Sequence, residues 1–134
     1  MKIINLYGKE VKFNPSKYSI NWDKVVSKPQ QKVKDVVKDY WSSHLVCEEM
    51  VIPGSKLRID LINFNLLLAI EISPSSSHSY NEFFHKNRSK YLISKKNEVL
   101  KDHWCIRNHI RLIEIFDEDL NNEELLTSKI FKYG

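Results

Sequence analysis

The chain has 134 residues, of which 42% are hydrophobic and 28% charged, the composition of one globular domain with its own core. No apolar run reaches the roughly 18 residues of a membrane span, and the first residues lack the apolar core of a signal peptide. We therefore expect a protein without membrane contact, located in the cytoplasm.

The net charge of +4 is spread unevenly along the sequence. Residues 1–38 contain nine lysines and three acids, and residues 86–111 contain eight Lys or Arg and two acids, whereas residues 114–124 contain six acids. Clustered basic residues are typical of a protein that binds the phosphate backbone of nucleic acid, although lysines also simply keep proteins soluble.

The two cysteines do not form a metal motif. Cys47 lies in a predicted strand and Cys105 follows a predicted helix, and no C-x-x-C spacing is present. We expect both to be small buried hydrophobic residues in a reducing compartment.

Residues 1–28 are expected to form an extension with a short hairpin, in which 3–7 pairs with 11–14. A helix follows over residues 30–43. Ser27 is a capping residue and Pro29 is tolerated in a first turn. One apolar stripe recurs at helical spacing: Val33, Val36, Val37, Tyr40 and Trp41.

Three strands are predicted next, over residues 45–52, 56–63 and 66–72, with a turn at Pro53-Gly54-Ser55. The second strand alternates, so Leu57, Ile59 and Leu61 should face one side and Arg58, Asp60 and Ile62 the other. The third strand is almost wholly apolar, which is typical of a central strand covered on both faces.

After a polar loop, a helix is predicted over residues 81–104 and a strand over 110–116. Residues 121–134 should form a short helix or a tail. The element order predicts an α+β domain with a mixed central sheet flanked by helices, and its core should span residues 29–120.

Two acids interrupt the apolar strands: Asp60 and Glu71, with ten residues between them. Burying ionised carboxylates is costly, so two of them in one hairpin suggest a shared divalent cation such as Mg²⁺. If a tight loop at Phe64-Asn65 joins the two strands, a simple antiparallel register should leave the acids near opposite ends of the hairpin, and a bulge or splaying would be needed to bring them together.

This Asp-x10-Glu arrangement, between one helix and a later helix and strand, resembles the PD-(D/E)XK nuclease superfamily with its restriction-endonuclease-like fold. The resemblance implies that Asp60, Glu71 and the carbonyl of Ile72 bind Mg²⁺, for which Mn²⁺ can substitute. It also implies a lysine two residues after the glutamate, where this chain has Ser73.

Some members of the superfamily, such as the cap-snatching endonucleases, carry that lysine on the following helix. Lys86 and Lys90 are then the candidates, with a plain solvated lysine as the alternative. The branch of very-short-patch repair and EDxHD homing endonucleases has a histidine in the preceding loop, which His78 matches. That histidine could equally be an ordinary loop residue.

Accessory residues stay open. Gln30 or Gln31 stands near the position of the first-helix acid of many members, and Glu48 or Glu49 could substitute from the next strand. A two-residue turn at Pro53-Gly54 would place Glu49 opposite Arg58, whereas a three-residue loop would place Glu48 opposite Asp60.

The resemblance implies a metal-dependent DNA endonuclease of phage or mobile-element (homing) type, acting in the host cytoplasm. Lys86 or His78 would assist the attacking water, while Arg88, Lys90 and Lys95 would hold the DNA backbone. A homodimer would supply the two sites that double-strand cleavage needs. The alternatives are a structure-selective nuclease or junction resolvase, an RNA endonuclease, and an inactive nuclease fold that binds DNA.

Overall fold

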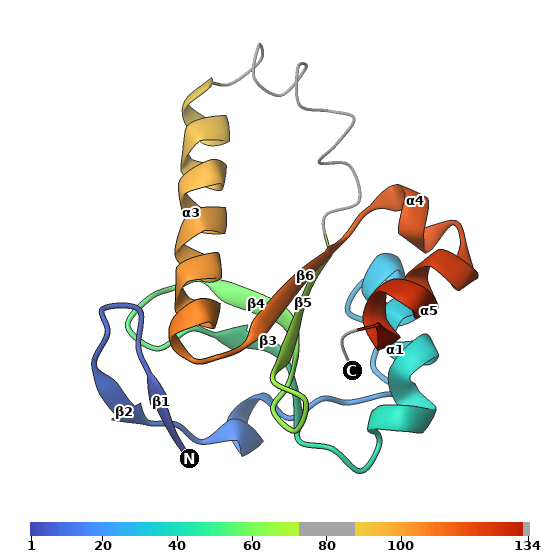
Figure 1. Ribbon diagram of the computed structural model, residues 1–134, viewed down its shortest axis with the longest axis horizontal. Helices are drawn as coiled ribbons and strands as arrows, with labels where there is room; N and C mark the ends of the chain where they lie inside the picture. The colour runs from blue at the N-terminus through green and yellow to red at the C-terminus, as the bar shows by residue number, and fades with distance from the viewer. Residues whose placement is uncertain (73–87, 133–134) are drawn as a thin grey trace.

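A four-stranded sheet in the order β3-β4-β5-β6 forms the middle layer of the protein (Figure 1). The computed structural model describes residues 1–72 and 88–132, with the backbone alone at 88–91 and 94. The fold is α+β, with helices on both faces of this mixed sheet. The elements are β1 (Lys2–Ile4), β2 (Glu10–Lys12), the 3-10 helix η1 (Pro15–Tyr18), α1 (Lys28–Trp41), β3 (Val46–Val51), β4 (Arg58–Asn63), β5 (Leu68–Ile72), α3 (Arg88–Arg107), β6 (Arg111–Ile115), α4 (Asp117–Leu120) and α5 (Glu123–Phe131).

Strands β3, β4 and β5 form the predicted antiparallel meander, and β6 runs parallel to β5. β5 lies between β4 and β6, and its Leu68, Ala69 and Ile70 are buried. The prediction of a central strand covered on both faces is therefore confirmed. The helix after the meander gives the chain room to return for a parallel strand.

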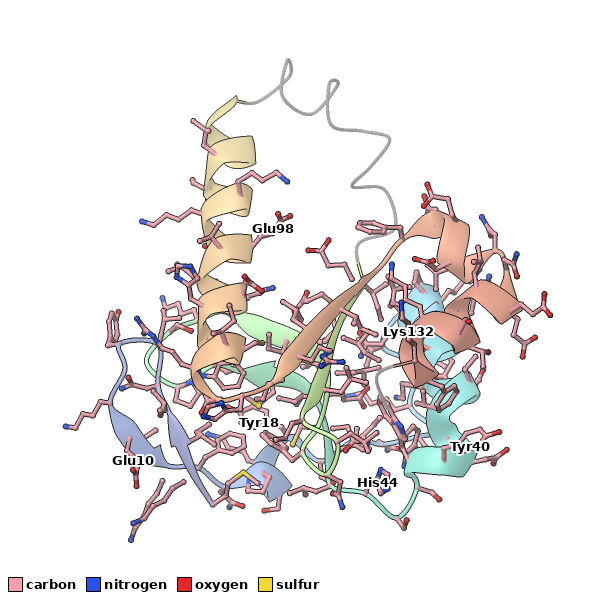
Figure 2. The ribbon with its side chains drawn as sticks, viewed as in Figure 1. Glu10, Tyr18, Tyr40, His44, Glu98 and Lys132 are labelled. Carbon is pink, nitrogen blue, oxygen red and sulfur yellow. The ribbon has the colours of Figure 1, made fainter. Side chains whose placement is uncertain are left out.

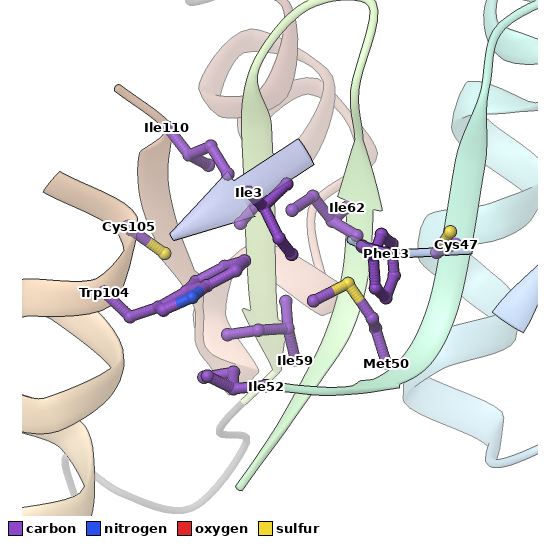
Figure 3. Close-up of a cluster of buried hydrophobic side chains, with 11 residues drawn as sticks. Ile3, Phe13, Cys47, Met50, Ile52, Ile59, Ile62, Trp104, Cys105 and Ile110 are labelled. Carbon is purple, nitrogen blue, oxygen red and sulfur yellow. The ribbon is translucent and has the colours of Figure 1, made fainter. Parts of the chain in front are cut away.

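One face of the sheet packs against α3 and the β1–β2 hairpin (Figure 3). Trp104 and Cys105 of α3 and Ile3 of β1 lie in this cluster, with Met50 and Ile59 from the sheet. The indole N–H of Trp104 donates to the Ile4 carbonyl at 2.7 Å, which fixes the hairpin to the helix. The predicted hairpin is thus present and contributes to the core.

The opposite face packs against α1 and α5. Val33, Val37 and Trp41 of α1 are buried there with Leu126 and Ile130 of α5. The C-terminal residues 123–131 therefore form a helix that belongs to the core. Among the described residues, no helix combines the length and the apolar character that crossing a membrane requires.

Helix α1 is capped as its sequence predicts, although it spans Lys28–Trp41 and not residues 30–43. The Ser27 side chain accepts a hydrogen bond from the Gln30 N–H at 3.3 Å, and Pro29 stands in the first turn, where its missing N–H has no consequence. The buried positions follow the predicted apolar stripe at spacings of three and four residues, although Tyr40 is exposed.

The second long helix, α3, extends to Arg107, beyond the predicted end at residue 104. Cys105 therefore lies inside α3, and the prediction that it follows the helix is wrong. Both cysteines are buried and free, as expected. Burial raises the pKa of Cys47 to about 11 and that of Cys105 to about 12, so both stay protonated and unreactive at neutral pH.

Candidate functional site: a carboxylate pair facing a helix lysine

Asp60 and Glu71 face each other across neighbouring strands. Leu61 of β4 pairs with Ile70 of β5, and one further step along each strand places Asp60 opposite Glu71. The prediction that the two acids would be separated is wrong, because it assumed a tight loop at Phe64-Asn65 and that loop does not occur. The acids lie one residue beyond the last printed pair of the β4–β5 ladder, Leu61 with Ile70, and the pairs up to that point run without a bulge.

The hairpin loop explains this register. Asn63 pairs with Leu68, so the loop comprises residues 64–67 and not only Phe64-Asn65. The Asn63 side-chain oxygen accepts from the N–H groups of Asn65 and Leu66 at 2.9 and 3.0 Å, and Leu67 has a φ of 54°. Side-chain capping by Asn and one left-handed residue make this longer turn.

Two further groups contact this pair of acids: the backbone N–H of Ile72 and the side chain of Lys101. The Ile72 N–H donates to Asp60 Oδ2 at 2.8 Å, and Lys101 of α3 reaches both Glu71 carboxylate oxygens at 3.4 Å. Asp60 and Glu71 are also close enough to hydrogen-bond when one of them is protonated. The site thus joins β4, β5 and α3.

The charges in this site are not balanced. Burial, and next the charge of Asp60, raise the pKa of Glu71 to about 7, while Lys101 acts in the opposite direction. Burial raises the pKa of Asp60 as well, against the Ile72 N–H and the charge of Lys101. One lysine facing two partly buried carboxylates leaves a surplus of negative charge, which a cation or a proton would neutralise.

Alternation along β4 breaks at Asp60. Ile59 and Ile62 both pack on the α3 side of the sheet, whereas Leu61 packs on the α1 side. The prediction that Leu57, Ile59 and Leu61 share one face is therefore wrong for Leu61. Where the in-and-out alternation of side chains is interrupted at one residue, that residue's side chain can point toward the end of the sheet and not into the core.

The neighbouring strand β3 also interrupts its regular side-chain alternation, at Glu49. It is missing from the pairing between Glu48–Leu61 and Met50–Ile59, so it lies across from Asp60, and its φ is 51°. A positive φ is uncommon for glutamate and marks a local departure from regular strand geometry. Burial, and then the charge of Asp60, raise the pKa of Glu49, so this third acid belongs to the electrostatics of the site.

The structure has neither of the two predicted strand registers, Glu49 opposite Arg58 or Glu48 opposite Asp60. Glu48 lies opposite Leu61 and is buried on the α1 side, so it does not join Asp60. Glu49 is not opposite Arg58, although its carboxylate lies 3.9 Å from the Arg58 guanidinium. The β3–β4 connection, residues 52–57, is longer than either alternative assumed.

The two glutamines of α1 differ. Gln30 is buried and donates to Glu48 Oε2 at 3.2 Å. It also hydrogen-bonds Glu49, so it lies between the buried Glu48 and the carboxylate site. Gln31 points elsewhere, since its amide donates to Asp35 at 2.9 Å and to the Trp22 carbonyl at 3.4 Å. Of the two candidates, Gln30 is therefore the one near the carboxylates.

The remaining candidates fall outside this cluster. Ser73, His78 and Lys86 lie outside the described residues. Arg88 and Lys90 are placed by their backbone in the first turn of α3, and Lys95 lies further along that helix with its ammonium 3.2 Å from Glu98.

Sequence reasoning missed Lys101, although a signal for it was present. Trp104 and Cys105 are three and four residues further along α3 and face the sheet, so Lys101 had to lie on the same face. Glu114 of β6 pairs with Glu71 in the parallel register.

Carboxylates are suitable ligands for a hard cation, but the number of protein ligands is small. Within residues 1–72 and 88–132, no group of three or more His, Cys, Asp or Glu side chains is arranged to hold a metal ion. Asp60 and Glu71 supply a pair, and Mg²⁺ usually takes one or two carboxylates and completes its shell with water and phosphate oxygens. The donor chemistry and the surplus of negative charge fit such an ion.

Comparison with known proteins gives a match over part of this chain. No family model matches the chain, and no solved structure matches it. A segment of 64 residues is 31% identical to the uncharacterized protein 033L of Invertebrate iridescent virus 3. That segment covers 48% of this chain and 33% of the viral protein, so the chain corresponds to about a third of that relative.

Proposed function

We propose that this protein is a metal-dependent DNA endonuclease with a restriction-endonuclease-like fold. The observation that carries the proposal is the placement of Asp60 opposite Glu71, with Lys101 against Glu71. Buried acids with raised pKa values beside a specific charge partner are more frequent at functional sites than elsewhere. The order of one helix, three antiparallel strands, a helix and a parallel strand is the one that the PD-(D/E)XK resemblance implies.

Asp60, Glu71 and the carbonyl of Ile72 would hold Mg²⁺ or Mn²⁺. The bound ion would supply a polarised phosphate oxygen and a more acidic water. The residues around it set the rest of the chemistry. The Ile72 N–H fixes one oxygen of Asp60, and Lys101 holds both oxygens of Glu71, so the two carboxylates are oriented before substrate binds.

Lys101 is the residue that we assign to the role of the superfamily's lysine. Its ammonium lies on the α3 side of the carboxylate pair, where it can approach a phosphate or the attacking water. A fixed cation at this place stabilises the charge that develops on the phosphate during hydrolysis. Lys86 and His78 keep their candidacy from sequence, while Arg88, Lys90 and Lys95 would contact the DNA backbone from α3.

DNA is the substrate we favour, with RNA and branched DNA as the variants to test. The viral relative is in keeping with a nuclease carried by a phage or another mobile genome. The rival function is a DNA-binding module with an inactive site. Its support is Gln30, an amide near the position where many members have an acid, and the small number of protein ligands.

The first experiment incubates the full chain with supercoiled plasmid, branched DNA, single-stranded DNA and RNA, each with Mg²⁺ or Mn²⁺. Asp60→Asn and Glu71→Gln should abolish metal-dependent cleavage, because each removes a charged ligand. Asp23→Asn changes an exposed aspartate in a loop and serves as the matched control.

Binding is measured in parallel at several salt concentrations. Affinity that falls with salt and survives both substitutions, without cleavage by the wild type in either metal, would favour the binding module. Cleavage that persists in both variants would overturn the assignment of Asp60 and Glu71.

A further inference from the structure

The outer side of α3 carries an apolar stripe that nothing in the described chain covers. Leu92, Val99 and Ile106 are between 52% and 62% exposed. They are seven residues apart, and seven residues are close to two turns, so the three side chains form one nearly straight line. This seam, Leu92-Val99-Ile106, lies opposite the buried Trp104 and Cys105, and Figure 2 shows side chains projecting from this helix into open space.

The seam is symmetric about Val99, with one apolar residue seven positions to either side. We propose that the seam binds the same seam of a second copy, with the two α3 helices antiparallel. Leu92 then packs against Ile106 of the second copy, and Val99 packs against Val99. A two-fold contact of this kind is self-complementary, which a stripe facing an unrelated partner need not be.

The charges beside the seam match the same antiparallel register. Lys95 and Asp102 lie on the same flank of the seam, four residues before and three residues after Val99. Antiparallel pairing brings Lys95 of one copy beside Asp102 of the other, twice in the dimer. Lys95 already contacts Glu98 at 3.2 Å in its own chain, and in the dimer it would lie between Glu98 and the partner's acid. A parallel arrangement would instead place the two Lys95 side chains on opposite flanks of the contact, so the pairing with Asp102 would be lost.

The contact leaves the carboxylate site open. Lys101 projects from the sheet side of α3, whereas the seam faces the opposite way. The inference does not depend on the nuclease proposal, since it concerns self-association alone. The seam spans about 21 Å of helix, so the dimer should be a weak one.

Sedimentation velocity of the full chain, from about 1 to about 300 µM, is the test, because a contact confined to one helix belongs in this affinity range. The wild type should change from monomer to dimer with concentration. Val99→Glu should weaken the dimer at least tenfold, because it places two ionised carboxylates against each other in an apolar contact. Val25→Glu makes the same change at an exposed valine remote from α3 and should leave the dimer intact.

Charge reversal provides the second arm. Lys95→Glu alone and Asp102→Lys alone should each weaken the dimer, and the double variant should restore it, because the pair is re-formed with its signs exchanged. Circular dichroism confirms that each variant is folded. A wild type that stays monomeric over the whole range, or an equal loss in Val99→Glu and Val25→Glu, would overturn the proposal. So would a double variant weaker than both single ones.

Discussion

On each face of the sheet a helix lysine pairs with a strand glutamate, but the two pairs have different surroundings. On the α1 face, Lys34 lies 3.0 Å from Glu48, with side chains only 1% and 9% exposed. The Lys34 ammonium also donates to the carbonyls of Asn21 and Lys24, and Glu48 accepts from Gln30 and from the Asn21 N–H. Every charge in this pair is met by a partner.

On the α3 face, Lys101 lies 3.4 Å from Glu71, and their side chains are 22% and 14% exposed. Here a second carboxylate, Asp60, stands opposite the first, and the lysine cannot neutralise both. A fully satisfied buried pair fixes the packing of a helix on a sheet, whereas a pair with surplus charge is poised to bind a cation or exchange a proton. The contrast favours the α3 face as the location of the proposed site.

The largest expected effect comes from breaking the satisfied pair. Lys34→Met leaves the buried Glu48 carboxylate without its cation, and it should lower the free energy of unfolding by about 3–5 kcal/mol. Urea denaturation measures the loss. The matched control is Lys38→Met on the same helix, where Lys38 makes an exposed contact with Asp23 at 3.7 Å. That change should amount to less than about 1 kcal/mol. Equal losses in the two variants would remove the distinction between the pairs.

Much of the fold could be predicted because its signals are local. The apolar stripe and Ser27 cap of α1, the apolar β5 and the turn between β3 and β4 each depend on neighbouring residues in the chain. Asp60 and Glu71 stood out for a similar reason, since an acid inside an apolar strand is costly wherever the strand lies.

The errors concern geometry between elements. The four residues of the β4–β5 loop were not evident, because a side-chain cap by Asn63 and a left-handed Leu67 have no strong signature. The interrupted alternation at Glu49 contradicts the ordinary preference of glutamate for negative φ. Lys101 required knowing which side of α3 faces the sheet, and among many lysines that choice depends on Trp104 and Cys105 as reference points.

A smaller effect, of opposite sign, should follow from removing the unbalanced charge. The pKa of Glu71 is raised from 4.5 to about 7 in the folded protein, so the folded state binds a proton that the unfolded state has released. The contribution of this proton to the free energy of unfolding is fully present below about pH 4.5 and is lost as the pH rises through about 7. Without metal, Glu71→Gln should therefore be more stable than the wild type at about pH 8, by at most about 3 kcal/mol, with little difference at about pH 4.5.

Thermal or urea unfolding across this pH range, in the presence of a chelator, gives the measurement. Asp23→Asn, at an exposed carboxylate, should show no gain that grows with pH. A Glu71→Gln variant that is less stable than the wild type at high pH would mean that Lys101 alone balances the site.

The smallest expected effect concerns Lys101 and tests whether the lysine on the α3 face contributes to activity as well as to packing. Lys101→Met should reduce the cleavage rate at saturating DNA about 100-fold, equal to about 2.7 kcal/mol, because it removes one fixed cation from the developing phosphate charge. Lys96→Met removes a lysine from the exposed part of the same helix and should leave that rate unchanged. If both variants cleave at the wild-type rate, Lys101 acts only as the counterion of Glu71, and the missing motif lysine must be sought at Lys86 or Lys90. If both variants lose activity equally, the lysines of α3 contribute non-specific electrostatic attraction for DNA, and Lys101 is not a positioned catalytic cation.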